Sequence, residues 1–319
     1  MPSVDQFTAA VKQEFANAKM DAEVKGPPSW QEYTTVLPST TKAENHLIGA
    51  VLPGVTEYKG YREYVNPSAK IYTLTNKDYH TAIKCPKNDI EDDQTGMYLR
   101  AVRTWPQVMQ DYPGVLVQQL LRLGESTVCW DGSNFFADSH NVGTVDNLIT
   151  KTGSGDASGV VHRVCFLVNN PALQPVFYQE RQAPTGVETD ADTPQASEAK
   201  MYRYWADMRG VAGFGLHWDA IMLKITNKPT IAEVQSYIRD VEDAFRSFTV
   251  DSVLSGESTR YFHANLVPSV STMTVVAASS VASLFRPVLE KATITLSGGV
   301  VENDVVGFGK LIPSAYLNA

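Results

Sequence analysis

The stretch DDQTGMYLRAVRTWPQVMQDYPGVLVQQLLRLG, from Asp92 to Gly124, predicts the long helix around which the chain is organised. Its apolar residues recur three and four positions apart, and acidic residues lie near the positive end of the helix dipole. We therefore expect a helix over about residues 92–123. Pro106 and Pro113 each lack a backbone donor and crowd the preceding turn, so they should kink or divide this helix.

The N-terminal residues predict a shorter amphipathic helix over residues 4–18, capped by Ser3 and Gln6 and stopped by the glycine and prolines at 26–28. A helix of this length does not bury an apolar face by itself. It packs either on its own subunit, which is the simpler expectation, or on a neighbouring subunit. Its apolar face consists of Val4, Phe7, Val11, Phe15 and Ala18.

Residues 58–85 predict a long β-hairpin that projects from the body. Two β-prone runs, Lys70–Thr75 and Tyr79–Cys85, flank turn-forming residues at 76–78. The segment has few apolar residues, so we expect an exposed arm and not a part of the core. Its basic side chains are Lys59, Arg62, Lys70, Lys77 and Lys84.

The remaining segments predict an α+β fold without β–α–β alternation. Strands are expected at 160–168, 201–206 and 216–225, with a polar loop at 184–199. Thr230 and Glu233 form a capping box ahead of an amphipathic helix. After this helix we expect a strand at 261–267, a serine-rich helix at 271–285, and strands at 292–296 and 305–312.

Length and composition exclude several classes of protein. The chain has 319 residues, 43% hydrophobic and 19% charged, and a mean hydropathy of −0.18, which indicates about two globular domains. A net charge of −8 argues against a surface that neutralises nucleic-acid phosphates. Three widely spaced cysteines indicate neither disulfides nor a zinc knuckle. We expect no signal peptide and no membrane span.

No motif predicts catalysis. In CWDGSNFFADSH, residues 129–140, the side chains of Asp131, Asp138 and His140 are the best candidate metal ligands. Their spacing matches no metal motif, and turn chemistry explains Asp131, Gly132 and Asn134 without a ligand. The glycines at 210–215 do not form a dinucleotide fingerprint. We therefore predict no catalytic, cofactor or metal residues, and keep a metal-dependent hydrolase as a rival hypothesis.

Several collinear stretches nevertheless resemble one family. They are TTVLPSTTKAE (34–44), NDIEDDQTGMY (88–98), YPGVLVQQLLRLG (112–124), CWDGSNFFADSH (129–140), QERQAP (179–184) and DMRGVAGFGL (207–216). In order and spacing they resemble the major head subunits of Mu-like phages, whose fold is that of the tailed-phage capsid protein of phage Hong Kong 97. A proline usually follows the histidine in that family, where this chain has Asn141.

The resemblance implies an N-terminal arm (1–28), a P-domain (29–225) with the spine helix and an E-loop hairpin at about 58–85, and an A-domain (226–319). It implies a non-enzymatic virion protein, without cofactors, that assembles into pentamers and hexamers around double-stranded DNA. Scaffolding, portal and decoration proteins are the expected partners, and an encapsulin-like compartment is the alternative. Candidate interface residues are Phe7, Val11, Phe15, Lys59, Arg62, Lys70, Lys77, Lys84, Glu91, Asp92 and Asp93.

Overall fold

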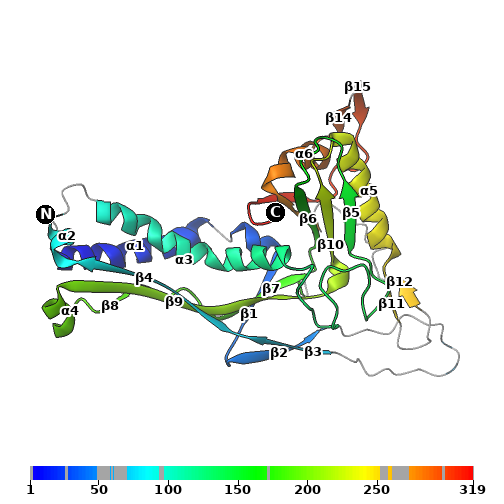
Figure 1. Cartoon of the computed structure of the whole chain (residues 1–319). Coiled ribbons are helices and arrows are strands. Elements are labelled where there is room, and N and C mark those ends of the chain that lie inside the picture. Colours follow the sequence, from blue (N-terminus) through cyan, green and yellow to red (C-terminus); the bar gives the residue numbers. More distant parts are fainter. Residues whose placement is uncertain are drawn as a thin grey trace.

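The computed structural model describes residues 3–25, 28–48, 58, 60, 70–92, 97–170, 173–251, 258–260, 273–296 and 299–318. These residues form two main sheets, each covered by helices (Figure 1). One layer is long and extended, and the other stands upright at its end. Among the helices of the described residues, none has the length and apolar character needed to cross a membrane.

The extended layer is a sheet with strand order β1-β7-β9-β4. Its strands are β1 (Thr34–Pro38), β7 (Val176–Gln182), β9 (Met201–Phe214) and β4 (Lys77–Pro86), and the short β8 (Glu188–Thr189) also pairs with β9. Helices α1 (Val4–Lys25) and α3 (Met97–Arg122) lie side by side along this layer (Figure 1). The chain enters it through the 3-10 helix η1 (Ser29–Tyr33).

The upright layer is a sheet with strand order β16-β13-β6-β10-β5. The strands are β5 (Leu148–Thr152), β6 (Val161–Val168), β10 (Ala220–Thr226), β13 (Met273–Ala278) and β16 (Lys310–Ser314). Helices α5 (Ile231–Ser247) and α6 (Ser279–Glu290) pack on this sheet and on each other. Strands β13 and β16 are parallel and joined through α6, so the described residues include a β–α–β connection, which the sequence did not predict.

Smaller elements extend from the two layers. Strands β2 (Ala43–Ile48) and β3 (Lys70–Thr75) pair as an antiparallel ribbon, and α2 (Lys87–Glu91) precedes α3. Helix α4 (Pro194–Ala199) lies in the expected polar loop, and the 3-10 helix η2 (His217–Asp219) joins β9 to β10. Two further ribbons are β11 (Thr249–Asp251) with β12 (Ser258–Arg260), and β14 (Thr293–Leu296) with β15 (Gly299–Glu302).

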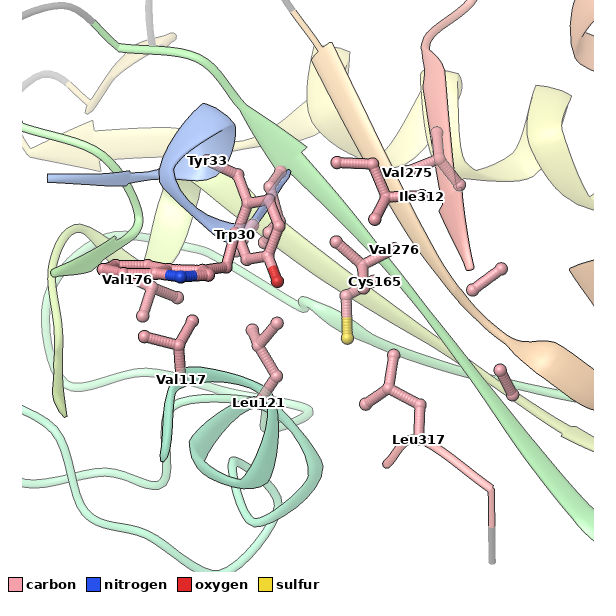
Figure 2. Packing of buried hydrophobic residues seen from close by; sticks show 14 of the residues in the cluster. Trp30, Tyr33, Val117, Leu121, Cys165, Val176, Val275, Val276, Ile312 and Leu317 are labelled. Atoms are coloured by element: carbon pink, nitrogen blue, oxygen red, sulfur yellow. The ribbon is translucent and has the colours of Figure 1, made fainter. Parts of the chain in front are cut away.

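A single hydrophobic core joins the two layers. Figure 2 shows Val117 and Leu121 of α3 facing Trp30 and Tyr33 of η1 and Cys165 of β6. All five side chains are buried, and four of them have no exposed surface. Because residues from both sheets share this core, the last turns of α3 fix the position of one layer relative to the other.

The long helix is confirmed, but it is not divided. Helix α3 continues through Pro106 and Pro113 to Arg122. An internal proline costs about 3 kcal/mol, and burial of a large apolar side chain contributes about 1.5–3 kcal/mol. Met109, Val117 and Leu121 are all buried along this helix, which offsets the two prolines.

The predicted hairpin over residues 58–85 is wrong in its pairing. Strand β3 pairs with β2, and β4 pairs with β9 along its whole length. Only Asn76 separates β3 from β4, and no residue at 76–78 has the positive φ that a tight hairpin turn needs. The buried Asn76 instead hydrogen-bonds to Ser39, Thr41 and Gln179, so the chain passes from one ribbon into the next sheet.

Two expectations for the C-terminal third are corrected. Residues 273–278 are strand β13, with six buried residues, and helix α6 begins only at Ser279. A strand buried on both faces shows no alternation, so its sequence resembles that of a buried helix. Of the strand expected at 305–312, only residues 310–312 are in a strand, which is β16 and continues to Ser314. The strand expected at 261–267 lies outside the described residues. The Thr230–Glu233 capping box is confirmed.

The domain boundary expected at 225/226 falls within the upright layer. Strands β5 and β6 precede it, β10 spans it, and β13 and β16 follow it, yet all five form one sheet. A division there would leave strands unpaired, so the two sheets, and not residue 225, mark the structural units of the chain.

Gly114 of α3 provides a test of the shared core. A Cβ atom at this position would lie 2.5 Å from Cδ1 of the buried Trp30. Although alanine favours a helix by about 1 kcal/mol over glycine, overpacking costs about 1–3 kcal/mol. We expect Gly114→Ala to lower the free energy of unfolding in urea denaturation of the unassembled chain. Val108→Ala, at a position that is 62% exposed on the same helix, should change it by less than about 0.5 kcal/mol. Equal or greater stability of Gly114→Ala would contradict this packing.

Candidate interaction surfaces and a buried polar cluster

The β2–β3 ribbon has one anchored face and one open face. His46 and Tyr72 are directly paired, and both rings lie edge-on to Phe177 of β7, at centroid distances of 4.8 and 6.5 Å. The next pair, Leu47 and Ile71, points to the opposite face and is 71% and 64% exposed. Adjacent large apolar side chains at this exposure indicate a contact surface.

The apolar face of α1 packs inside its own subunit. Phe7 and Val11 have no exposed surface, and Phe15 is 4% exposed. Phe7 lies edge-on to Tyr204 of β9 at 5.5 Å, and Phe15 lies edge-on to Trp105 of α3 at 4.9 Å. The helix extends to Lys25, beyond the expected 4–18. In this arrangement the three side chains stabilise the subunit and leave the opposite face of α1 for any neighbour.

The charged interface candidates do not belong to one arm. Lys70 lies on β3, whereas Lys77 and Lys84 lie on β4, and all three are exposed. Glu91 ends α2 and forms an ion pair with Lys87 at 3.7 Å, and the exposed Asp92 follows it. Lys59, Arg62 and Asp93 lie outside the described residues.

The loop that follows α3 carries a second candidate site, and two side chains anchor its ends. Glu125 accepts hydrogen bonds from Arg163 (2.7 Å) and Lys224 (2.5 Å), which are opposite each other on β6 and β10. The fully buried Asn147 donates to the carbonyls of Phe135 (2.8 Å) and His217 (2.9 Å) and accepts from the amide of Ala137. These bonds hold the loop against the β9–β10 connection.

Asp131 is the centre of a buried polar cluster in this loop. Its Oδ1 accepts from the thiol of Cys129 and the amide of Ser133, both at 2.9 Å. Its Oδ2 pairs with Nδ1 of His140 at 2.9 Å and accepts from the amide of Asn141 at 3.1 Å. Burial alone would raise the pKa of Asp131, but the hydrogen bonds from His140 and Cys129 outweigh it and hold this pKa well below its usual range.

His217 completes the cluster from η2. Its ring stacks on that of His140 with centroids 3.8 Å apart and an interplanar angle of 2°. Its Nε2 hydrogen-bonds to the carbonyl of Val142 at 3.1 Å, whereas its buried Nδ1 has no hydrogen-bond partner. Burial, with the neighbouring His140, lowers the pKa of His217 to about 3, so the ring is neutral. Burial also raises the pKa of the Cys129 thiol.

The structure therefore brings together two of the three metal ligands considered from the sequence. Asp131 and His140 meet, but Asp138 is exposed and lies outside the cluster. Cys129 and His217 were missed as partners, because Cys129 matches no ligand spacing and His217 is distant in sequence. The side chains of Asp131 and His140 have no exposed surface, so the cluster offers no access for a substrate.

Comparisons with known sequences agree on one family. A profile of the Mu-like prophage major head subunit gpT matches residues 4–251. The major head subunit of Mu-like prophage FluMu of Haemophilus influenzae is 31% identical over 202 residues, which cover 61% of this chain and 66% of that protein. The major capsid protein of Escherichia phage Mu is 26% identical over 232 residues, which cover 70% of this chain and 73% of that protein.

Solved structures of bacteriophage JBD30 have the same fold. Its capsid superimposes with a TM-score of 0.72 at 20% identity, covering 94% of both chains. Its procapsid gives 0.68 at 26% identity, covering 97% of this chain and 98% of that one. Its capsid decorated with minor capsid protein trimers gives 0.69 at 20% identity, covering 92% of both.

The two sheets, the long α3 and these superpositions define the class of protein. The chain has the Hong Kong 97-type fold and is a major capsid protein of a tailed-phage head, a structural class that is not enzymatic. More closely, it belongs to the family of the Mu-like prophage major head subunit gpT. The family assignment leaves no support for the hydrolase or for the encapsulin-like compartment.

Replacing Asp131 tests the importance of the buried cluster. Asp131→Ala removes the acceptor of four hydrogen bonds and leaves the His140 ring without its carboxylate. Breaking a buried pair in this way costs about 3–5 kcal/mol. We expect a corresponding fall in the free energy of unfolding measured by urea denaturation. Asp138→Ala, which removes an exposed carboxylate from the same loop, should stay within about 0.5 kcal/mol of the wild type. Similar values for both variants would contradict the central role of Asp131.

Proposed function

We propose that many copies of this chain assemble into pentamers and hexamers, which close into an icosahedral head around the double-stranded DNA of a tailed phage or prophage. The family and the fold support this proposal. The observation that carries it is the Leu47–Ile71 pair on the open face of the β2–β3 ribbon. A monomer would leave these side chains in water, whereas a neighbouring subunit would cover them.

The small binding free energy of one such contact is consistent with a shell, in which the contact is repeated many times. Complete burial of one leucine or isoleucine contributes about 1.5–3 kcal/mol, too little for a stable pair of subunits once the entropy of association is included. A closed symmetric assembly repeats the same contact at every subunit, so weak contacts become cooperative. Weak individual contacts also allow misplaced subunits to dissociate.

The extended layer corresponds to the P-domain of the capsid fold, with α3 as its spine helix and α1 as the N-terminal arm. The upright layer corresponds to the A-domain. The E-loop corresponds to the β2–β3 ribbon. This assignment replaces the expected boundaries of 58–85 and 225/226, because it follows the strand pairing.

Scaffolding and portal proteins are proposed partners of the assembling head. Decoration proteins are a further proposed class, supported by the JBD30 capsid that carries minor capsid protein trimers. The net charge of −8 opposes tight binding to phosphates, which suits a container that holds DNA without recognising its sequence.

The apolar pair gives the direct test of this function. Wild-type chain, expressed alone or with its scaffolding partner, should form closed shells in negative-stain electron microscopy. The double variant Leu47→Asp, Ile71→Asp should remain folded by circular dichroism but should form no shells, because two carboxylates would be buried at each contact. Val108→Asp, which places the charge on the exposed face of α3, is the matched control for fold stability. Strictly monomeric wild-type protein under both conditions would refute the proposal. Normal shells from the double variant would show that the apolar pair does not lie in the interface.

The exposed lysines give a second test, on the charge of the contacts. Lys70, Lys77 and Lys84 are proposed to meet acidic residues such as Glu91 and Asp92 of a neighbouring subunit. Exposed ion pairs contribute about 0–1 kcal/mol each, so their main effect is on register and orientation. Reversal of all three to glutamate should slow shell formation, followed by light scattering, and should do so less at high salt.

A triple reversal of Lys12, Lys19 and Lys291 changes the net charge equally at other exposed positions and serves as the control. Equal effects of the two triple variants would show that only net charge matters, and would contradict the proposed contact.

A further inference from the structure

The cluster around Asp131 contains the ligand set of a structural metal site. Cys129, Asp131, His140 and His217 each offer one ligand atom, and these four atoms lie within 4.8 Å of one another. Sulfur, imidazole nitrogen and carboxylate oxygen are the ligands that zinc takes in proteins. The four side chains come from two segments far apart in sequence, the loop at 129–140 and η2 at 217.

An unpaired atom points to a missing partner in this cluster. Nδ1 of His217 is buried and makes no hydrogen bond, although a buried polar atom without a partner costs about 1–3 kcal/mol. Its Nε2 is held by the carbonyl of Val142. A neutral histidine that donates from one nitrogen to a backbone carbonyl presents a lone pair on the other, which is the usual arrangement of a metal ligand.

We propose that Cys129, Asp131, His140 and His217 bind one divalent transition-metal ion, zinc by preference, in a closed structural site between the two layers. This inference goes beyond the assembly function and does not depend on it. Ligand atoms around a tetrahedral zinc lie about 3.3–3.8 Å apart, which is closer than the separations of up to 4.8 Å in this cluster. Binding requires a contraction of about 1 Å across the cluster and a rotation of the His140 and His217 rings out of their parallel stack, so that a nitrogen lone pair of each ring points at the ion.

Metal binding releases two protons that the cluster holds in the absence of the ion. The hydrogen bonds from Cys129 and His140 to the carboxylate of Asp131 account for one proton on the thiol and one on Nδ1. The ion takes the place of both protons, which are released to solvent. His140 keeps the proton on Nε2, which it donates to Oδ1 of Asn147 at 3.2 Å, so the ion is bound by the thiolate, two neutral imidazoles and the carboxylate. The amides of Ser133 and Asn141 remain as donors that orient Asp131.

The site is closed and therefore structural. Four protein ligands leave no position for water or substrate, unlike the three-ligand sites of zinc enzymes. The ion would join the loop after α3 to the connection between β9 and β10. Trp130 already links these two segments by donating to the carbonyl of Gly215 at 2.9 Å. A metal ion at this point would stabilise the junction of the extended and upright layers.

The test uses the full-length chain, purified without chelators. Zinc content by inductively coupled plasma mass spectrometry should approach one ion per chain. Protein produced with cobalt should show the near-ultraviolet charge-transfer band of a cobalt–thiolate bond and the visible bands of tetrahedral cobalt. Removing zinc with a chelator should lower the Tm of the wild type.

Matched variants locate the site. Cys129→Ser should abolish the cobalt–thiolate band, and His217→Asn should weaken binding by more than the roughly 10–100-fold that follows loss of a ligand's hydrogen-bond partner. Cys85→Ser and His162→Asn, at a buried cysteine and a buried histidine outside the cluster, should retain the band and the metal. A folded wild type that contains no transition metal and binds no cobalt would overturn the proposal, even if the variants fail to fold. So would an unchanged cobalt spectrum in Cys129→Ser.

Discussion

Burial of the last turns of α3 against both sheets is the contact on which the rest of the structure depends. Val117 and Leu121 have no exposed surface, and the residues around them come from η1, β6, β7, β13, β16 and the C-terminal segment (Figure 2). Each sheet thus uses the same helix to complete its core. The two layers are one folding unit at this point, although each extends well beyond it.

Local signals in the sequence were sufficient for the helices and insufficient for strand pairing. The capping box at Thr230 and the periodic face of α3 are determined by residues a few positions apart, so both were predicted. The partner of β4 is β9, more than one hundred residues later, and no local pattern identifies it. Alternation in residues 70–85 correctly indicated strands, but the assumption that neighbours in sequence pair with each other led to the wrong hairpin.

The buried polar cluster shows that local sequence patterns are also insufficient to predict a site whose residues are far apart in sequence. The sequence CWDGSNFFADSH indicated that Asp131 is a turn residue, and its hydrogen bonds from the amides of Ser133 and Asn141 agree with that interpretation. His217 is absent from any such motif, because only the crossing from β9 to β10 brings it against His140. The periodic apolar face of α1 identified the side chains that are buried, but periodicity alone does not show which subunit buries them.

The nearly continuous run from β3 into β4 has a mechanical consequence. A pull on the β2–β3 ribbon passes through Asn76 and acts along β4, whose ladder with β9 extends from Lys77 to Pro86. Its inter-strand hydrogen bonds lie across the direction of that pull, so the load is shared by the whole ladder in shear. A hairpin loaded at its open end would instead lose its bonds one after another, as in peeling. Tension on this ribbon is thus transmitted to the extended sheet without the stepwise loss of hydrogen bonds at the edge of that sheet.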